Sequence, residues 1–263
     1  MPGSSNLLGS LQGLIGERNL NIAALDYSAL SKIENELINM REIMPIEWDL
    51  PVTDDLSLGE VFTRQIGKFY YNLLLKNAHF PYMLRVSPSG ESYSYSRTTA
   101  LDASRKMIEH YHGLRHSAQG ELLICDLMDF QVFAAAIVIV INLLFTTTQS
   151  NDYQRKEDWA LIQALSQTLH RQARAMTCTV AKQAAELLDY LNAAGHDLYT
   201  RDEPVVAVIP YLEECVSVTQ ENINPPALEI MILRYPLILS SLALRLSHLM
   251  DLIWVDTIEA TAS

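Results

Sequence analysis

Cysteine is scarce in this sequence, with three among 263 residues, at Cys125, Cys178 and Cys215. The three are far apart, odd in number, and no two have the short spacing of zinc ligands. This pattern excludes a disulfide-rich secreted scaffold and a cysteine-based zinc finger. We therefore expect an intracellular protein, located in the cytoplasm or the nucleus.

Positive charge is also in short supply, because 19 Lys and Arg stand against 31 Asp and Glu, for a net charge of −12. Binding to a nucleic-acid duplex requires clustered basic side chains that neutralise phosphates. A chain with this charge is repelled by DNA and by anionic membrane surfaces. The sequence therefore predicts no direct binding to nucleic acid and no membrane association.

Long apolar runs are absent. The most apolar segment, Val132–Phe145, has only 14 residues and contains Asn142, so it is too short to cross a bilayer. The N-terminal segment lacks the basic start and the apolar stretch of a signal peptide. Gly and Pro number only 10 each, and hydrophobic residues make up 49%, which is enough for a substantial core.

Apolar residues recur at steps of three and four through most of the chain, which is typical of helices with one buried face. Capping residues and breakers mark several ends, including the capping box formed by Ser57 and Glu60. The expected helices span 26–45, 57 to beyond 73, 96–114, 126–145, the region around 159–169, and 177–195, followed by an apolar segment at 226–253 that Pro236 kinks or interrupts.

The helix at 126–145 is apolar nearly all round, so we expect it at the centre of the fold. Residues 205–209 and 215–219 are short β-branched runs that favour two small strands. The predicted fold class is all-α, a single multi-helix bundle around that central helix, with a small irregular or β subregion near 200–225. The predicted organisation is a lead-in at 1–25 and one helical domain at 26–263.

Polar side chains on the central helix are the first candidates for a functional site. Asp126 and Asp129 lie in its first turns, where carboxylates favour the positive end of the helix dipole. The competing interpretation is that Asp129 sits at the mouth of an apolar pocket, together with Gln131. Asn142 lies inside the apolar run and either bonds to another helix or points into a ligand cavity.

A second candidate stretch combines aromatic and basic side chains, namely His79, Tyr82, Arg85, Tyr93, Tyr95, Arg97 and Arg105. Arginine stacked on tyrosine is a common packing unit, whereas the same interleaving can also bind an anion. The strongly negative net charge favours the packing interpretation.

Metal and cofactor motifs are the next consideration. His112 and His116 have the four-residue spacing that lets two imidazoles share a metal, but no Glu follows the first as in HExxH. The sequence contains no Gly-rich phosphate loop, GxSxG elbow or dinucleotide fingerprint. We therefore expect neither a metal nor a cofactor.

Several segments resemble, in order, the fungal-specific transcription factor domain. His79–Arg85 (HFPYMLR) is similar to that family's HLPFLLR. Tyr93–Arg97 and Leu101–Arg105 (YSYSR, LDASR) resemble its YEYSR and CLEAAR. Asp129–Ala136 (DFQVFAAA) resembles its DFQAFTAA, and Val208–Tyr211 (VIPY) resembles the start of its IPYFG.

That family's domain is the middle homology region of zinc-binuclear-cluster regulators, an all-α regulatory region that usually follows a cluster of six cysteines. The resemblance implies the all-α fold, and this sequence lacks the zinc cluster. We expect a helical module without its own DNA-binding part that binds a hydrophobic small molecule or a protein partner as a regulator. A homo-oligomer is compatible with the sequence.

The alternative is a repurposed, cofactor-independent enzyme of the cyclase or pericyclase type, acting on a hydrophobic intermediate of secondary metabolism. In that case the catalytic groups would be Asp129 and His79. In either case the predicted ligand-binding residues are Tyr82, Arg85, Arg97, Asp126, Asp129, Gln131 and Asn142.

Overall fold

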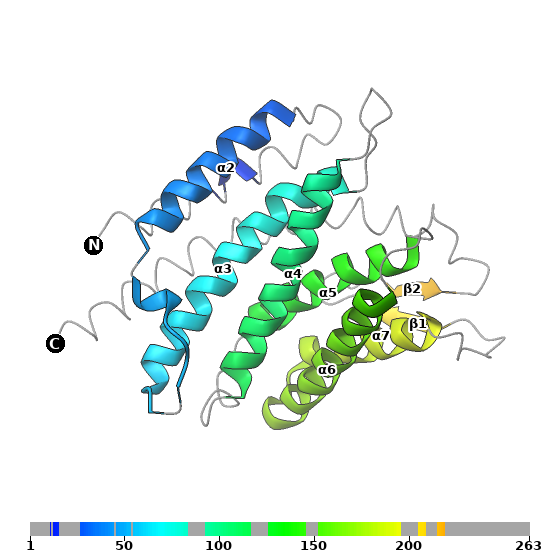
Figure 1. Cartoon of the computed structure of the whole chain (residues 1–263). Helices are drawn as coiled ribbons and strands as arrows, with labels where there is room; N and C mark the ends of the chain where they lie inside the picture. The colour runs from blue at the N-terminus through cyan, green and yellow to red at the C-terminus, as the bar shows by residue number, and fades with distance from the viewer. Residues whose placement is uncertain are drawn as a thin grey trace. The chain divides into compact units, whose positions relative to one another are not determined.

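The computed structural model describes residues 11, 13–15, 27–44, 46–53, 55–83, 93–116, 126–145, 152–195, 205–208 and 215–218. Its elements are α2 (Tyr27–Glu42), the 3-10 helix η2 (Ile46–Asp49), α3 (Leu58–Met83), α4 (Ser94–Arg115), α5 (Asp126–Phe145), α6 (Asp152–Met176), α7 (Thr179–Gly195), β1 (Val205–Val208) and β2 (Cys215–Val218) (Figure 1). The predicted all-α class is confirmed. The proposed cap Asp26 and the expected apolar segment 226–253 lie outside the described residues.

The small β subregion expected near 200–225 is also present. β1 and β2 pair as an antiparallel two-stranded sheet, with Val205 opposite Val218 and Val208 opposite Cys215. The two strands lie within the two β-branched runs of the sequence, so the β-branched composition identified them correctly.

The chain divides into two compact units, with the division falling inside α3 and α4. In its described part, the first unit contains α2, the segment of α3 from Leu74 onward and the first turns of α4, as far as Ala100. The second unit contains η2, the rest of α3 and α4, and all of α5, α6, α7 and the two strands. The single domain expected over 26–263 stays a prediction.

In the first unit, α2 buries one face through Leu30, Ile33, Leu37 and Met40. These residues follow the three-and-four spacing of the sequence, which places them on one side of a helix. From the last turns of α3, Leu74, Ala78, Phe80 and Tyr82 are buried as well. The apolar spacing therefore predicted the buried face of α2 correctly.

In the second unit, α5 packs against both α6 and α7. All its side chains from Met128 to Ile141 are buried, as its uniformly apolar sequence requires. Among the residues that the structure describes, no helix is both long enough and apolar enough to cross a membrane.

The start of α3 shows the predicted capping box. The backbone N–H of Glu60 donates to Ser57 Oγ over 3.3 Å, and the backbone N–H of Ser57 donates to Glu60 Oε2 over 3.0 Å. These reciprocal bonds satisfy donors that a helix N-terminus leaves unpaired.

A tight link of two residues, Thr177 and Cys178, joins α6 to α7. Thr177 has φ of 54°, in the left-handed region that a β-branched residue rarely adopts. Cys178 Sγ accepts a hydrogen bond from the backbone N–H of Ala181 at 3.3 Å, so the thiol caps the start of α7. The link turns the chain sharply and holds α6 and α7 together as a hairpin.

Candidate functional site

Asp129, near the start of α5, is the centre of a buried polar cluster in the second unit. Its side chain is only 3% exposed, and Oδ1 accepts a hydrogen bond of 2.7 Å from Arg115 Nη2. The same oxygen accepts another bond of 2.7 Å from the hydroxyl of Tyr111. Tyr111 and Arg115 are four residues apart on α4, so one face of that helix presents both donors to α5.

The third neighbour of Asp129 comes from the α6–α7 link. Cys178 Sγ lies 3.7 Å from Asp129 Oδ2, and the thiol is buried. The guanidinium carbon of Arg115 also lies 5.1 Å from the centre of the Tyr111 ring, which is within cation–π range. The cluster therefore connects α4, α5 and the start of α7 through one carboxylate.

The electrostatics of this cluster keep Arg115 charged and the Tyr111 hydroxyl protonated. Burial lowers the pKa of Arg115, but nearby Tyr111 and Asp129 more than compensate, so the pKa is raised and the guanidinium stays charged. Burial, reinforced by the Asp129 charge, raises the pKa of Tyr111 well above its usual range, which keeps its hydroxyl a donor. Asp129 is thus an acceptor for two permanent donors on α4.

The other predicted residues of α5 are placed differently. Gln131 is 2% exposed, and its Oε1 has no hydrogen-bond partner among the described residues. Asn142 is half-buried in the last part of the helix. Asp126 begins α5, but its side chain lies outside the described residues. Among the predicted ligand-binding residues that the structure describes, Gln131 therefore has an acceptor with no hydrogen-bond partner.

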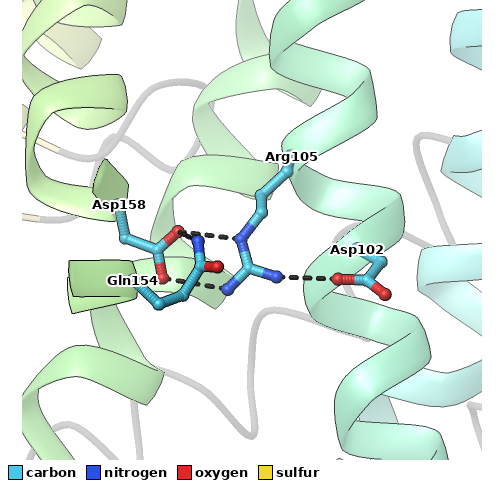
Figure 2. Close-up of polar contacts among 4 residues, drawn as sticks. All are labelled: Asp102, Arg105, Gln154 and Asp158. Atoms are coloured by element: carbon cyan, nitrogen blue, oxygen red, sulfur yellow. Dashed lines mark hydrogen bonds and ion pairs between the residues drawn. The ribbon is translucent and has the colours of Figure 1, made fainter. Parts of the chain in front are cut away.

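A second charged cluster in this unit joins α4 to α6 (Figure 2). Arg105 forms a fork with Asp158, from Nε to Oδ1 at 2.8 Å and from Nη2 to Oδ2 at 2.9 Å. Its Nη1 donates to Asp102 Oδ1 at 2.7 Å, and Gln154 Nε2 donates to Asp158 Oδ1 at 3.3 Å. This bidentate geometry is the strong form of the arginine–carboxylate pair, and the hydrogen bond to Asp158 raises the pKa of Arg105. We interpret the cluster as a structural clamp.

The first unit has its own polar cluster, around the fully buried His79 of α3. His79 Nδ1 lies 3.2 Å from Ser96 Oγ, and Nε2 lies 3.3 Å from Glu34 Oε1. Ser96 Oγ also lies 3.2 Å from the hydroxyl of Tyr27. A hydrogen bond to Glu34 raises the pKa of Tyr95, which lies edge-on to the His79 ring. His79 is thereby held between a carboxylate and a hydroxyl.

Aromatic side chains surround that cluster. Tyr82 is 1% exposed and packs edge-on against Tyr27 and Tyr93, with ring centres 5.1 and 5.5 Å apart. Arg97 is half-buried in the first turns of α4, and Arg85 lies outside the described residues. Tyr82 therefore contributes to aromatic packing in this unit.

The histidine pair on α4, His112 and His116, contacts a threonine and an arginine of α6, which are not metal ligands. The rings of His112 and His116 stack with centres 5.6 Å apart. Thr168 Oγ1 lies 3.2 Å from His112 Nδ1, and Arg171 Nη2 lies 2.8 Å from His116 Nε2. Burial, together with His116 and Arg171, lowers the pKa of His112 to about 4. In the described part of the chain, no group of three or more His, Cys, Asp or Glu is arranged to hold a metal.

The structure brings together residues that the sequence did not connect. Asp129 was a candidate, but its partners Tyr111, Arg115 and Cys178 were not identified. A signal was available, because Arg115 follows the apolar Tyr111 by one helical turn and so shares its buried face. The catalytic roles named for Asp129 and His79 and the ligand-binding role named for Tyr82 stay predictions.

Comparison with known proteins gives relatives that are all fungal regulators. The chain is 26% identical over 190 residues to "Transcription factor sdnS" of Sordaria araneosa, covering 68% of this chain and 24% of that protein. It is 30% identical over 179 residues to a "Dehydrocurvularin biosynthesis regulator" of Aspergillus terreus, covering 64% of this chain and 24% of the relative. A protein of the same name from Alternaria cinerariae is 30% identical over 129 residues, 48% of this chain and 17% of its own length.

The matches therefore cover about a quarter or less of each relative's length. No family model and no solved structure matches the chain. These similarities support a fungal transcription-factor-like protein, whereas the assignment to the middle homology region stays a prediction.

Proposed function

We propose that the chain is a helical regulatory module of the kind found in fungal transcription factors and that it binds a hydrophobic small molecule. The observation that carries the regulatory part is the similarity to three regulators, of which one match extends over 68% of this chain. Two of the relatives are named as biosynthesis regulators, which supports a role in secondary metabolism. Such a module acts in the nucleus or between cytoplasm and nucleus.

The buried amide of Gln131 favours a small molecule over a protein partner. Its Oε1 is inaccessible to solvent and has no hydrogen-bond partner among the described residues, and such orphan acceptors cost free energy. A protein surface cannot reach an atom enclosed within the helices, whereas a small molecule with a hydroxyl or amide donor can. The neighbouring residues along α5, Phe130, Val132 and Phe133, are buried and apolar, which favours a hydrophobic ligand.

Regulation also fits the polar clusters better than catalysis does. Asp129 is engaged by Arg115 and Tyr111, so its carboxylate is occupied as an acceptor. All three relatives described above carry the names of regulators, which favours this function over the cyclase alternative. The net charge of −12 supports a module that reaches promoters through other parts or partners and does not bind DNA directly.

The test is a reporter assay in a fungal host. The full chain is fused to a heterologous DNA-binding domain and an activation domain, and cells receive an apolar extract of a fungal culture that produces polyketides. We expect reporter output to change at least about threefold and the Gln131→Leu variant to lose most of that response while keeping its basal output.

The matched control is Gln163→Leu. Gln163 is exposed on α6, so this substitution is the same chemical change placed at the surface. Equal responses of Gln131→Leu and Gln163→Leu contradict the role of Gln131. A reporter output that no extract changes contradicts the regulatory function.

A further inference from the structure

Lys76 on α3 is the most unusual titratable residue in the first unit. Its side chain is fully enclosed, with 1% of the residue exposed, and its Nζ has no hydrogen-bond partner among the described residues. The other five lysines of the sequence are exposed or half-buried: Lys32, Lys68, Lys106, Lys156 and Lys182. An ammonium group without a counter-ion is among the most costly groups to bury, so this enclosure disfavours the charged form.

The enclosure of Lys76 is apolar in its effect. Burial is the cause that shifts the pKa of its amine, and no charged group contributes. Leu74 on the same helix is buried as well. No described side chain hydrogen-bonds to the amine, so its lone pair is not engaged by any of them.

Two titratable groups of the same unit, His79 and Glu34, are already engaged with each other. His79 follows Lys76 by three residues and therefore lies on the same side of α3. Its Nε2 is 3.3 Å from Glu34 of α2, and its Nδ1 is 3.2 Å from Ser96 of α4. The Glu34 carboxylate is therefore committed to His79 and not to the lysine.

Burial lowers the pKa of Lys76 to about 7. At neutral pH, about half of the amine is then uncharged, whereas an exposed lysine with a pKa near 10.4 is neutral in less than about one molecule in a thousand. Neutral lysines in apolar surroundings are the nucleophiles that form Schiff bases with carbonyl compounds.

We propose that Lys76 captures carbonyl compounds, and that this second site takes an apolar aldehyde or ketone that condenses with the Lys76 amine to form an imine. The statement of ligand class rests on the proposed function as a small-molecule-responsive module. The site differs from Gln131, which belongs to the other unit.

The condensation balances without any further reagent. The nitrogen lone pair attacks the carbonyl carbon while the π electrons move to oxygen, and a proton moves from nitrogen to that oxygen. Loss of the second nitrogen proton and of the hydroxyl as water then forms the C=N bond. Nothing is oxidised or reduced, and water reverses the step, so the occupancy of Lys76 follows the concentration of the carbonyl compound.

The experiment measures the alkylation of each lysine in the intact chain. The protein is incubated at pH 7 with propanal and cyanoborohydride, which reduces an imine to a stable secondary amine, and peptide mass spectrometry gives the rate at each site. We expect Lys76 to react at least about tenfold faster than the exposed Lys32 and Lys106, because its neutral fraction is far larger.

Two controls establish that the folded environment is responsible. In concentrated urea, Lys76 should lose its advantage and react at the rate of the other lysines. Lys76→Arg should remove only the Lys76 label, and circular dichroism should show unchanged helix content. Lys76 reacting no faster than Lys32 in the folded chain overturns the proposal, because the amine is then either charged or closed to carbonyl compounds.

The outcome is separable from that of the regulatory function. A reporter that responds to extract while Lys76 shows no preferential alkylation overturns carbonyl capture and leaves the regulatory function supported. Preferential alkylation of Lys76 with no reporter response supports the reactive amine and overturns the regulatory function.

Discussion

Arg115→Met is the substitution that most directly tests the buried cluster around Asp129. The change keeps a long side chain of similar shape but removes the guanidinium, which donates to Asp129 Oδ1 over 2.7 Å. Asp129 is 2% exposed and cannot turn to water. The variant therefore contains a buried carboxylate whose charge has lost its counter-ion.

The expected cost follows from the burial of both partners, whose side chains are 1% and 3% exposed. Removing one partner of a buried ion pair typically lowers the free energy of unfolding by about 3–5 kcal/mol, because the charge of the remaining partner is left uncompensated. The Tyr111 hydroxyl still donates to the carboxylate, which places the estimate at the lower end, about 3 kcal/mol. For a protein of this size, that corresponds to a drop in Tm of roughly 6–12 °C.

The assay is urea unfolding followed by circular dichroism on four proteins: the wild type, Arg115→Met, Asp129→Leu and the double variant. We expect both single variants to be destabilised and the double variant to be more stable than either, because it leaves no unpaired charge. Lys182→Met is the control, since Lys182 forms an exposed pair with Glu186 at 3.9 Å, and its free energy of unfolding should not change measurably. Single-variant costs below about 1 kcal/mol, or costs that simply add in the double variant, refute the reasoning.

Three further predictions concern other parts of the structure. Arg105→Lys should lower the free energy of unfolding by about 1–2 kcal/mol in urea denaturation, because an ammonium cannot reproduce the two parallel bonds of the fork. Gly113→Ala should show less than the usual gain in Tm on replacing a helical glycine, because a Cβ there would lie 2.5 Å from Gln65 Nε2 and displace the side chain that contacts His110 at 3.0 Å. Gly59→Ala, with nothing within 4 Å, should show the full gain. The pKa of Lys76 is about 7 in the folded chain and near 10.4 when unfolded, so the unfolded chain binds more protons between these values. The free energy of unfolding of the wild type should therefore rise from pH 7 towards pH 10, by up to about 1.4 kcal/mol per pH unit. Denaturant midpoints measured across this range should rise for the wild type, and this rise should be absent in Lys76→Met.

Helices were the most predictable feature, because their apolar spacing and end signals are local. The expected range 126–145 coincides with α5, and the capping box at Ser57 marks the start of α3. α6 begins at Asp152, earlier than the apolar spacing around 159–169 alone indicated, because its first turns are polar and exposed. Polar turns leave no periodic signal, so such ends are not readable from apolar residues.

The site was less predictable, because its partners come from distant parts of the sequence. Asp129 was identified as a polar group beside an apolar run, but Arg115 and Cys178 reach it only through the packing of α4 and the α6–α7 link. Lys76 was missed for a related reason: nothing in the sequence around it distinguishes a lysine that snorkels to the surface from one that is enclosed.

The short link between α6 and α7 has a consequence for the order of folding. Thr177 and Cys178 alone separate two helices that pack along each other, so closing this hairpin costs little chain entropy. Contacts so close in sequence form faster than those that bring α4 to α5 across a longer connection. The left-handed backbone conformation of Thr177 is strained, and this strain raises the free energy of the closed turn. Thr177→Gly would remove the strain, because glycine adopts this conformation freely. We therefore expect the α6–α7 hairpin to act as the early folding nucleus of the second unit, with the glycine substitution accelerating refolding more than it slows unfolding.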